Sequence, residues 1–303
     1  MLRLPITYVD VFAARPLEGN SLPVVHSADG VSDETMARFA RRTRQSETVF
    51  LQQPSVPGAD YRNRIFTVES EIPFAGHPSL GAAAAICHRN GVSSAVLMQQ
   101  TMKGLHELRV ELSGDSGTVS MVQGECEFGA EVDARAIVQA LGISADALHA
   151  ELPPQLLSTG LPMLVIPLSS ASALHAARFD RAALSDALAN VDVDSVMSLN
   201  CYVVAEDSAH EWSARCFTLD VAHGEDPATG SAAGPFGAYL RDRLGLTHVS
   251  ISQGVDMGEP SRLHVDTSES IVVSGDVHVV GTGTITLPEQ SCLSPEPAGR
   301  PCR

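Results

Sequence analysis

Residues 64–67 (RIFT) and, a few positions later, residues 71–77 (EIPFAGH) form a pattern that occurs twice in this sequence. The second copy consists of residues 215–218 (RCFT) and 225–231 (EDPATGS), about half a chain length further on. A repeat on this scale indicates that one structural unit occurs twice. Since a chain of 303 residues also exceeds what a single hydrophobic core usually serves, the sequence predicts two similar domains.

Each copy of the repeat leads into a segment rich in alanine and glycine, at residues 78–88 and 232–244. Both segments are apolar on most faces, which is typical of a buried helix, and Gly91 and Gly245 are suitable helix stops. Further helices are predicted at 33–44, 134–141 and 181–190. Strands are predicted at 6–12, 22–25, 48–51, 62–67, 117–122, 164–167, 198–204, 270–273 and 277–280. The predicted fold class is α+β, with two similar units that each wrap a curved sheet around one central helix.

The formal net charge of −16 limits the kinds of partner. It argues against nucleic acid, because phosphate contacts require clustered Lys and Arg. The longest basic cluster, residues 38–44, lies on a predicted helix and is interpreted as a solvated helix face. A negative field also slows the approach of anions, so a site for acids would need local positive groups.

The six cysteines are scattered and form no CxxC pair, so no metal site and no redox motif is predicted. Scattered cysteines in a chain of this size suit a reducing cytoplasm. The first residues lack the apolar run of a signal peptide, and no segment is apolar for long enough to span a membrane. We therefore expect a cytoplasmic protein without a membrane partner.

The two helix starts, at Gly76-His77 and Gly230-Ser231, are candidates for a binding site. Packing of the two units about a pseudo-twofold axis would place them opposite each other. A helix start offers unpaired N–H groups and a positive dipole end, and glycine lets a ligand approach the backbone. Such a pair could bind a carboxylate and stabilise the enediolate-like charge formed when a neighbouring carbon loses a proton. The alternative is that both glycines serve only as tight turns.

Three side chains near these helix starts are candidates for proton chemistry. Glu47 precedes an apolar, strand-like run, where desolvation would make a carboxylate more basic; a solvated turn residue is the alternative. Asp226 stands where the first copy of the repeat has Ile72, although an Asp before Pro227 also favours a turn. His77 could relay a proton, or could simply hydrogen-bond to the backbone at a helix start.

These motifs resemble those of the PhzF family, the phenazine-biosynthesis isomerases within the diaminopimelate-epimerase-like fold. The resemblance spans residues 5–285. The matching segments are 10–12 with Gly19-Asn20, 46–48 (SET), 73–78 (PFAGHP) with Gly81, 226–235 (DPATGSAAGP) and 253–261.

The resemblance implies a barrel-like sheet around a central helix in each domain, with the site between the domains. We assign residues 1–118 to the first domain and 119–276 to the second. A strand from 277–286 is expected to complete the first domain, and 287–303 to form a mobile tail. Homodimers are common in the family, and no metal or organic cofactor is expected.

The resemblance also assigns roles to individual residues. Glu47 matches the general acid/base, while His77, Asp226 and Ser231 match residues that hold and polarise the substrate. The backbones of Gly76 and Gly230 match carboxylate binders, and Asn20 belongs to a matching motif and is assigned to substrate binding. Related epimerases use two cysteines as acid and base. No cysteine stands at either helix start, which argues against that mechanism here.

The sequence departs from the family pattern in places. Residues 21–23 read SLP where PLA is frequent, Glu259 stands where Arg is common, and residues 67–71 are variable. Residues 148–199 contain no recognisable motif. These departures leave the substrate open.

We therefore predict an isomerase, without metal or cofactor, that shifts a proton or double bond in a small unsaturated or amino-bearing carboxylic acid of secondary metabolism. The type member of the family isomerises a dihydro-hydroxyanthranilate. One alternative is an epimerase or lyase that uses the same carboxylate. Another is a carboxylate-binding protein that performs no chemistry.

Overall fold

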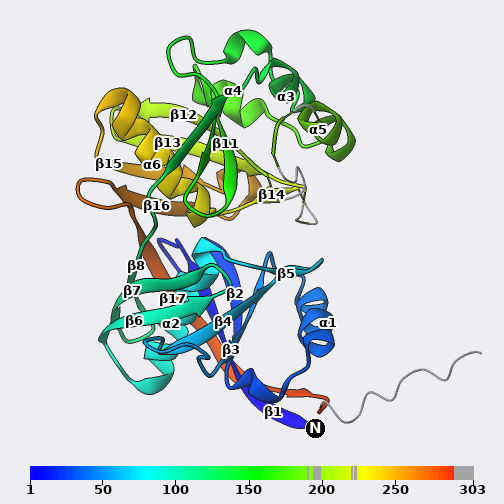
Figure 1. Ribbon diagram of the computed structural model, residues 1–303, viewed down its shortest axis with the longest axis vertical. Coiled ribbons are helices and arrows are strands. Elements are labelled where there is room, and N and C mark those ends of the chain that lie inside the picture. Colours follow the sequence, from blue (N-terminus) through cyan, green and yellow to red (C-terminus); the bar gives the residue numbers. More distant parts are fainter. Residues whose placement is uncertain (190, 194–198, 220, 222–223, 290–303) are drawn as a thin grey trace, which may run out of the picture.

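The computed structural model describes residues 1–189, 191–193, 199–219, 221 and 224–289. Each half of the chain wraps a curved sheet around one central helix, and the halves are stacked one above the other in Figure 1. This arrangement confirms the predicted α+β fold class with two similar units. None of the helices in the described part of the chain is long and apolar enough to cross a membrane.

The sheet of the first half closes into a barrel of eight strands. In order around the barrel these are β1 (Leu2–Val11), β2 (Asn20–Val25), β3 (Thr48–Gln52), β4 (Tyr61–Phe66), β6 (Ser94–Thr101), β7 (Gly104–Ser113), β8 (Ser116–Val122) and β17 (Val272–Leu287). Helix α2 (Gly76–Asn90) occupies the interior. Its small side chains allow the strands to come close: a Cβ atom at Gly81 would lie 2.6 Å from Leu22 Cδ2.

Helix α1 (Asp33–Thr43) covers the outside of this barrel after the short turn η1 (Ala28–Gly30). The Ser32 side chain caps it by accepting a hydrogen bond from the Thr35 N–H. Its apolar face packs on Phe50 and Phe66. The helix ends at Arg44 in a left-handed conformation, with φ of 57°, and the chain then turns directly into β3.

The second half repeats the plan with an additional outer layer. Its strands are β9 (Glu127–Glu131), β10 (Gln155–Ser158), β11 (Pro162–Leu168), β12 (Asn200–Ser208), β13 (Glu211–Phe217), β15 (His248–Gln253) and β16 (Ser261–Asp266), the last of which pairs with β17. Helix α6 (Gly230–Leu244) lies against the inner face. The outer elements are α3 (Arg135–Ala140), η2 (Ala145–Ala147), α4 (Ala171–Ala176) and α5 (Arg181–Leu188).

The outer layer explains the burial of the strands beneath it. In β7, which faces water on one side, burial alternates along the strand, whereas residues 201–205 of β12 are all buried. Alternate side chains of β12 point toward α6 and toward a second apolar cluster that contains Leu174 and Leu184. Segment 148–199, in which the sequence shows no motif, therefore contains two helices of this layer, α4 and α5. Its residues 190 and 194–198 lie outside the described residues.

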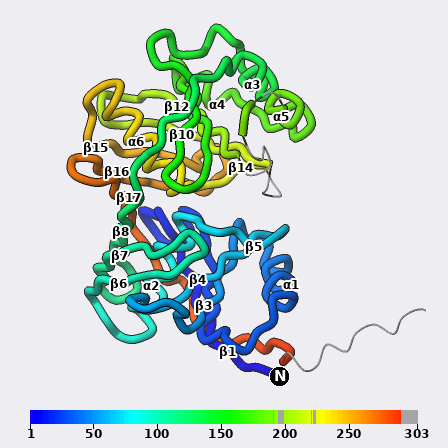
Figure 2. Tube along the Cα trace, viewed as in Figure 1, coloured from blue at the N-terminus to red at the C-terminus, as the bar shows by residue number. Residues whose placement is uncertain are grey.

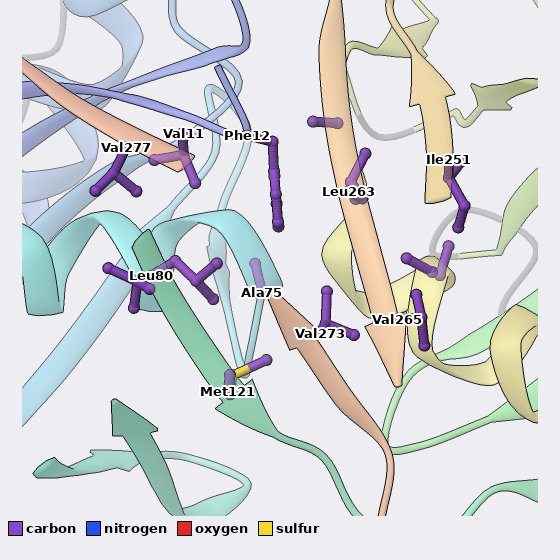
Figure 3. Packing of buried hydrophobic residues seen from close by; sticks show 14 of the residues in the cluster. Val11, Phe12, Ala75, Leu80, Met121, Ile251, Leu263, Val265, Val273 and Val277 are labelled. Carbon is purple, nitrogen blue, oxygen red and sulfur yellow. The ribbon is translucent and has the colours of Figure 1, made fainter. Parts of the chain in front are cut away.

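The two halves are joined by a shared core. Strand β17 pairs with β16 at one end and with β8 and then β1 along the rest of its length. The Cα trace in Figure 2 shows the chain crossing between the halves along β8 and β17. Figure 3 shows Phe12 between residues of the first barrel, such as Leu80, and residues of the second half, such as Leu263.

Three predictions about this region need correction. Segments 270–273 and 277–280 are not separate strands, because β17 runs unbroken through Gly275, where a Cβ would lie 2.3 Å from the Phe12 ring. The predicted domain boundaries, after 118 and after 276, fall inside β8 and β17. Leu287 does not belong to a tail, since it is buried and pairs with Leu2; residues 290–303 of the predicted tail lie outside the described residues.

Candidate active site

Helices α2 and α6 begin at the same place, where the two halves face each other. A Cβ atom added to Gly76 would lie 2.8 Å from the Gly230 Cα and 2.9 Å from the Ser231 backbone nitrogen. Both distances are shorter than real Cβ contacts, so only glycine fits without a shift of backbone atoms. The structure thus brings together the two helix starts that the sequence repeat singles out.

The repeated Arg and Glu residues set the approach to each helix. The Arg64 guanidinium donates two hydrogen bonds to the Glu71 carboxylate, and Arg215 does the same to Glu225, with Nε–Oε1 distances of 2.8 Å in both pairs. These pairs sit on two short ladders, in which β5 (Glu71–Ile72) pairs with β4 and β14 (Glu225–Asp226) pairs with β13. The ladders place Ile72 and Asp226 at equivalent positions beside the helix starts.

A cavity of about 210 Å³ opens at this junction. Its polar side chains are those of Glu47, His77, Asn200, Thr218, Asp226, Thr229 and Ser231, and its apolar wall includes Ile72, Phe74 and Leu161. The equivalent positions Ile72 and Asp226 both line it. The repeat therefore supplies an apolar group from one half and an acidic group from the other.

Glu47 reaches the cavity from the turn between α1 and β3. It is buried, with 8% of its surface exposed, which differs from the solvated turn residue considered as an alternative. Its Oε2 lies 3.3 Å from the Nε2 of His77. Burial lowers the pKa of His77 to about 3, so the imidazole is neutral at physiological pH.

Asn20 connects His77 with Asp226. Its Nδ2 lies 2.9 Å from Asp226 Oδ1, 3.3 Å from the Ala228 carbonyl oxygen and 3.2 Å from His77 Nδ1. A carbonyl oxygen only accepts, so the amide nitrogen of Asn20 must lie on this side. His77 Nδ1 then accepts a hydrogen bond, and the single proton of the neutral ring sits on Nε2, the nitrogen that faces Glu47.

Asp226 is held from several sides. Its Oδ2 accepts a hydrogen bond of 2.6 Å from the Thr229 hydroxyl, and its backbone oxygen accepts one of 2.8 Å from Gln253 Nε2. Gln253 in turn contacts the Thr229 hydroxyl at 3.0 Å and accepts from the Tyr202 hydroxyl at 3.2 Å. The orientation of this carboxylate is thus set by a buried network that includes three elements of the second half.

The helix starts remain open to a ligand. Neither N-cap residue, Ala75 in α2 or Thr229 in α6, caps its helix with a side-chain hydrogen bond. The first N–H groups of an α-helix have no partner within the helix, so those of both helices can point positive ends toward the cavity. Ser231, the second residue of α6, lines the same cavity. This geometry suits an anionic group bound by backbone N–H groups.

The structure brings together all seven site residues that the sequence predicts. It also adds residues that sequence reasoning missed: Leu161, Asn200 and Thr218 line the cavity, and Thr229 and Gln253 support Asp226. Thr229 and Gln253 belong to the matching segments 226–235 and 253–261, so these polar residues could have been predicted from the motifs. Leu161 precedes β11 and Asn200 begins β12, where no motif marks them.

No three His, Cys, Asp or Glu side chains in the described part of the chain come together as metal ligands. The described cysteines, Cys87, Cys126, Cys201 and Cys216, do not line the cavity.

The model of a known protein family matches this chain over nearly its whole length. The family model of PhzC-PhzF, phenazine biosynthesis-like protein, covers residues 9–287. The chain belongs to the PhzC-PhzF family. It is 34% identical to trans-2,3-dihydro-3-hydroxyanthranilate isomerase from Pseudomonas chlororaphis, over 92% of this chain and 98% of that protein. Together with this family membership, the isomerase names of such relatives identify the chain as an isomerase.

Solved structures agree with the fold of this PhzC-PhzF protein. A structure described as a predicted epimerase from Pseudomonas aeruginosa is 37% identical, with a TM-score of 0.79, and the match covers 94% of this chain and 99% of that one. A hydroxyproline epimerase from Agrobacterium vitis, at 11% identity, shares the fold with a TM-score of 0.64 over 93% of this chain and 91% of that one. The diaminopimelate-epimerase-like fold is therefore confirmed.

Proposed function

We propose that this isomerase moves a proton between two carbons of a small unsaturated or amino-bearing carboxylic acid, with Glu47 as the general acid/base. One observation carries the proposal. A buried carboxylate, in contact with a neutral imidazole, faces the same cavity as two helix starts without side-chain caps. The first group can transfer a proton, and the helix starts can hold the carboxylate next to the reacting carbon.

The reaction divides into two proton transfers. The ionised Glu47 takes a proton from a carbon conjugated to the substrate carboxylate, so that a C–H bond breaks and an O–H bond forms. The electron pair left behind delocalises toward the carboxylate, where the N–H groups at Gly76 and Gly230 stabilise it. Glu47 then returns the proton to a second carbon of the conjugated system, and the double bond ends one position away from where it began.

The neighbours of Glu47 have supporting roles in this scheme. The Nε2–H of the neutral His77 lies near Glu47 Oε2 and orients this oxygen. Because the ring is neutral, it places no positive charge beside the carboxylate. Asp226 and Ser231 are placed to hold polar substituents, and the wall of Ile72, Phe74 and Leu161 covers the apolar part. The cavity volume of about 210 Å³ is below the roughly 300–1,000 Å³ of pockets for drug-sized ligands, which favours a small acid.

Proton NMR in deuterated water tests the proposal. The panel contains trans-2,3-dihydro-3-hydroxyanthranilate, the compound in the name of the Pseudomonas chlororaphis relative, and other small cyclic dienoic and amino acids. We expect deuterium incorporation or migration of signals with the wild-type protein and none with Glu47→Gln. Equal exchange in both proteins would rule out Glu47 as the base.

The same assay separates the alternatives. Deuterium at a stereocentre without movement of a double bond would indicate an epimerase, and loss of water would indicate a lyase. Binding without exchange in either protein would indicate a carboxylate-binding protein. The family description, phenazine biosynthesis-like protein, supports a role in secondary metabolism. We further propose a cytoplasmic homodimer that works without metal or organic cofactor. Analytical ultracentrifugation tests the dimer, and activity after chelation tests the independence from metal.

A further inference from the structure

A second cavity, of about 360 Å³, lies beside the first. Asn20 lines it, while the Asn20 amide reaches His77 and Asp226 of the first cavity. Ser46 lines the second cavity and the adjacent Glu47 lines the first. Val221 lines both. The two spaces are therefore neighbours along the junction of the two halves, and a ligand longer than the first cavity would extend into the second.

Two opposite charges that are not paired with each other line this second cavity. Arg44 comes from the end of α1, and Glu259 comes from the loop that follows η4 (Val255–Met257). Among the described residues neither side chain forms an ion pair. The third charged residue of the lining, Glu225, is already bound by Arg215 through two hydrogen bonds. Arg44 and Glu259 thus keep their bonding capacity for a ligand.

The backbone of Arg44 has a conformation that is uncommon for residues other than glycine. The residue ends α1 with φ of 57°, in the left-handed region that favours glycine or asparagine because a Cβ atom is crowded there. The positive charge of an arginine interacts favourably with the negative end of the helix dipole, which offsets part of this backbone cost. Its long, exposed side chain belongs to a residue that lines the cavity, and a guanidinium suits a carboxylate bound through two hydrogen bonds.

Glu259 brings a negative charge to the lining of the same cavity. Burial and the negative charge of Asp10 both raise the pKa of Glu259. Asp10 is itself buried and accepts a hydrogen bond from the Leu17 N–H. A cation bound at Glu259 would relieve this repulsion, whereas a second anion would increase it.

We infer that the second cavity is a subsite for a zwitterionic α-amino-acid group at the far end of the substrate, with its carboxylate on Arg44 and its ammonium on Glu259. The inference rests on the proposed function, because it assumes that the first cavity holds the reacting carboxylate. It narrows the substrate class to acids that carry an amino-acid group distant from that carboxylate.

Calorimetric binding with matched ligands tests the subsite. The probes are glutamate, 2-aminoadipate and 2-aminopimelate, each compared with the dicarboxylate of the same length that lacks the amine: glutarate, adipate or pimelate. We expect at least one amino acid to bind about tenfold tighter than its partner, as an added charge-assisted hydrogen bond predicts. Equal affinity within every pair, or no binding of any probe at 10 mM, would overturn the inference.

Single substitutions test the separate roles of Arg44 and Glu259 in binding. Arg44→Asn removes the guanidinium but suits the left-handed conformation, so the fold should be retained while all probes bind about tenfold more weakly. Glu259→Gln should weaken only the amino acids and leave the dicarboxylates unchanged. Arg41→Gln and Glu269→Gln change exposed residues outside both cavities and serve as controls. If Arg44→Asn weakens binding no more than Arg41→Gln does, Arg44 does not form the subsite.

The failure of this inference can be told apart from the failure of the proposed function. Binding is measured without turnover, so a dependence on Arg44 and Glu259 in a protein that exchanges no deuterium would support the subsite and contradict the isomerase mechanism. If another acid is isomerised in a reaction that depends on Glu47, and KM is unchanged in Arg44→Asn and Glu259→Gln, the mechanism stands and the subsite is wrong.

Discussion

Gly76 and Gly230 begin two different helices, yet a Cβ atom on Gly76 would lie only 2.8 Å from the Gly230 Cα. The obstacle is backbone, which cannot rotate away as a side chain can. We expect Gly76→Ala to push the two halves apart, to lower the free energy of unfolding by about 1–3 kcal/mol as overpacking does, and to abolish carboxylate binding. Urea unfolding and calorimetry measure both effects.

Gly30→Ala is the matched control for this prediction. A Cβ at Gly30 would meet only the Leu2 side chain, at 3.5 Å, which is an ordinary contact distance. The free energy of unfolding of Gly30→Ala should stay within about 0.5 kcal/mol of the wild-type value, as for most surface substitutions. Wild-type binding and stability in Gly76→Ala would show that the close approach of the helices is not required.

Glu47→Gln keeps the shape of the side chain but removes the base. We expect kcat to fall by about 10²–10⁴-fold, the usual contribution of a general acid/base, with little change in substrate affinity. Glu127→Gln, on the exposed strand β9, should have wild-type kinetics. A loss of affinity with unchanged kcat would instead give Glu47 a binding role.

The neutrality of His77 predicts the direction of a pH effect. Its pKa is lowered from 6.5 to about 3 in the folded protein, so below pH 6.5 the unfolded chain binds a proton that the folded chain does not. Stability should therefore decrease as the pH falls from 6.5 toward 3, by up to about 1.4 kcal/mol per pH unit for this one group. In His77→Gln the decrease should be shallower, and His26, whose pKa is lowered to about 4, remains as a second contributor.

NMR provides a direct measurement of the same property. The ring signals of His77 should not titrate between pH 5 and 8, and its proton should be found on Nε2. The exposed His210 and His248 provide internal controls that can be followed in the same spectra. A titration of His77 near pH 6.5 would contradict the neutral imidazole and the orienting role proposed for its Nε2–H beside Glu47.

Asn20 is expected to act as a positioning residue. Asn20→Ala would remove the donor to Asp226 Oδ1 and to His77 Nδ1, both of which are buried. The cost should be about 1–3 kcal/mol for polar groups left without this partner, together with a lower kcat because the preferred tautomer of His77 is lost. The exposed Asn90, at the end of α2, is the control: Asn90→Ala should leave kcat unchanged.

Several features of this protein could be predicted from local sequence. The duplicated residues 64–77 and 215–231 predict two equivalent units, because the Arg and the Glu of each copy form the same ion pair on the same kind of short ladder in each half. Alanine and glycine after each copy predict a buried helix, since only small side chains fit where strands surround it. The motifs also indicated seven residues that the structure brings together, of which six line the cavity and the seventh, Asn20, contacts His77 and Asp226.

Only the tertiary structure decided the features that depend on how the halves dock. Asn200 and Leu161 reach the cavity because β11 and β12 begin there, and no local sequence pattern indicates that position. The continuity of β17 through Gly275 depends on Phe12, a residue more than 250 positions away that packs against it. The tautomer of His77 likewise depends on Asn20 and Asp226, which come from different halves. Local sequence determines which elements form, because propensity and periodicity act over a few residues; contacts between distant residues exist only once those elements are packed together.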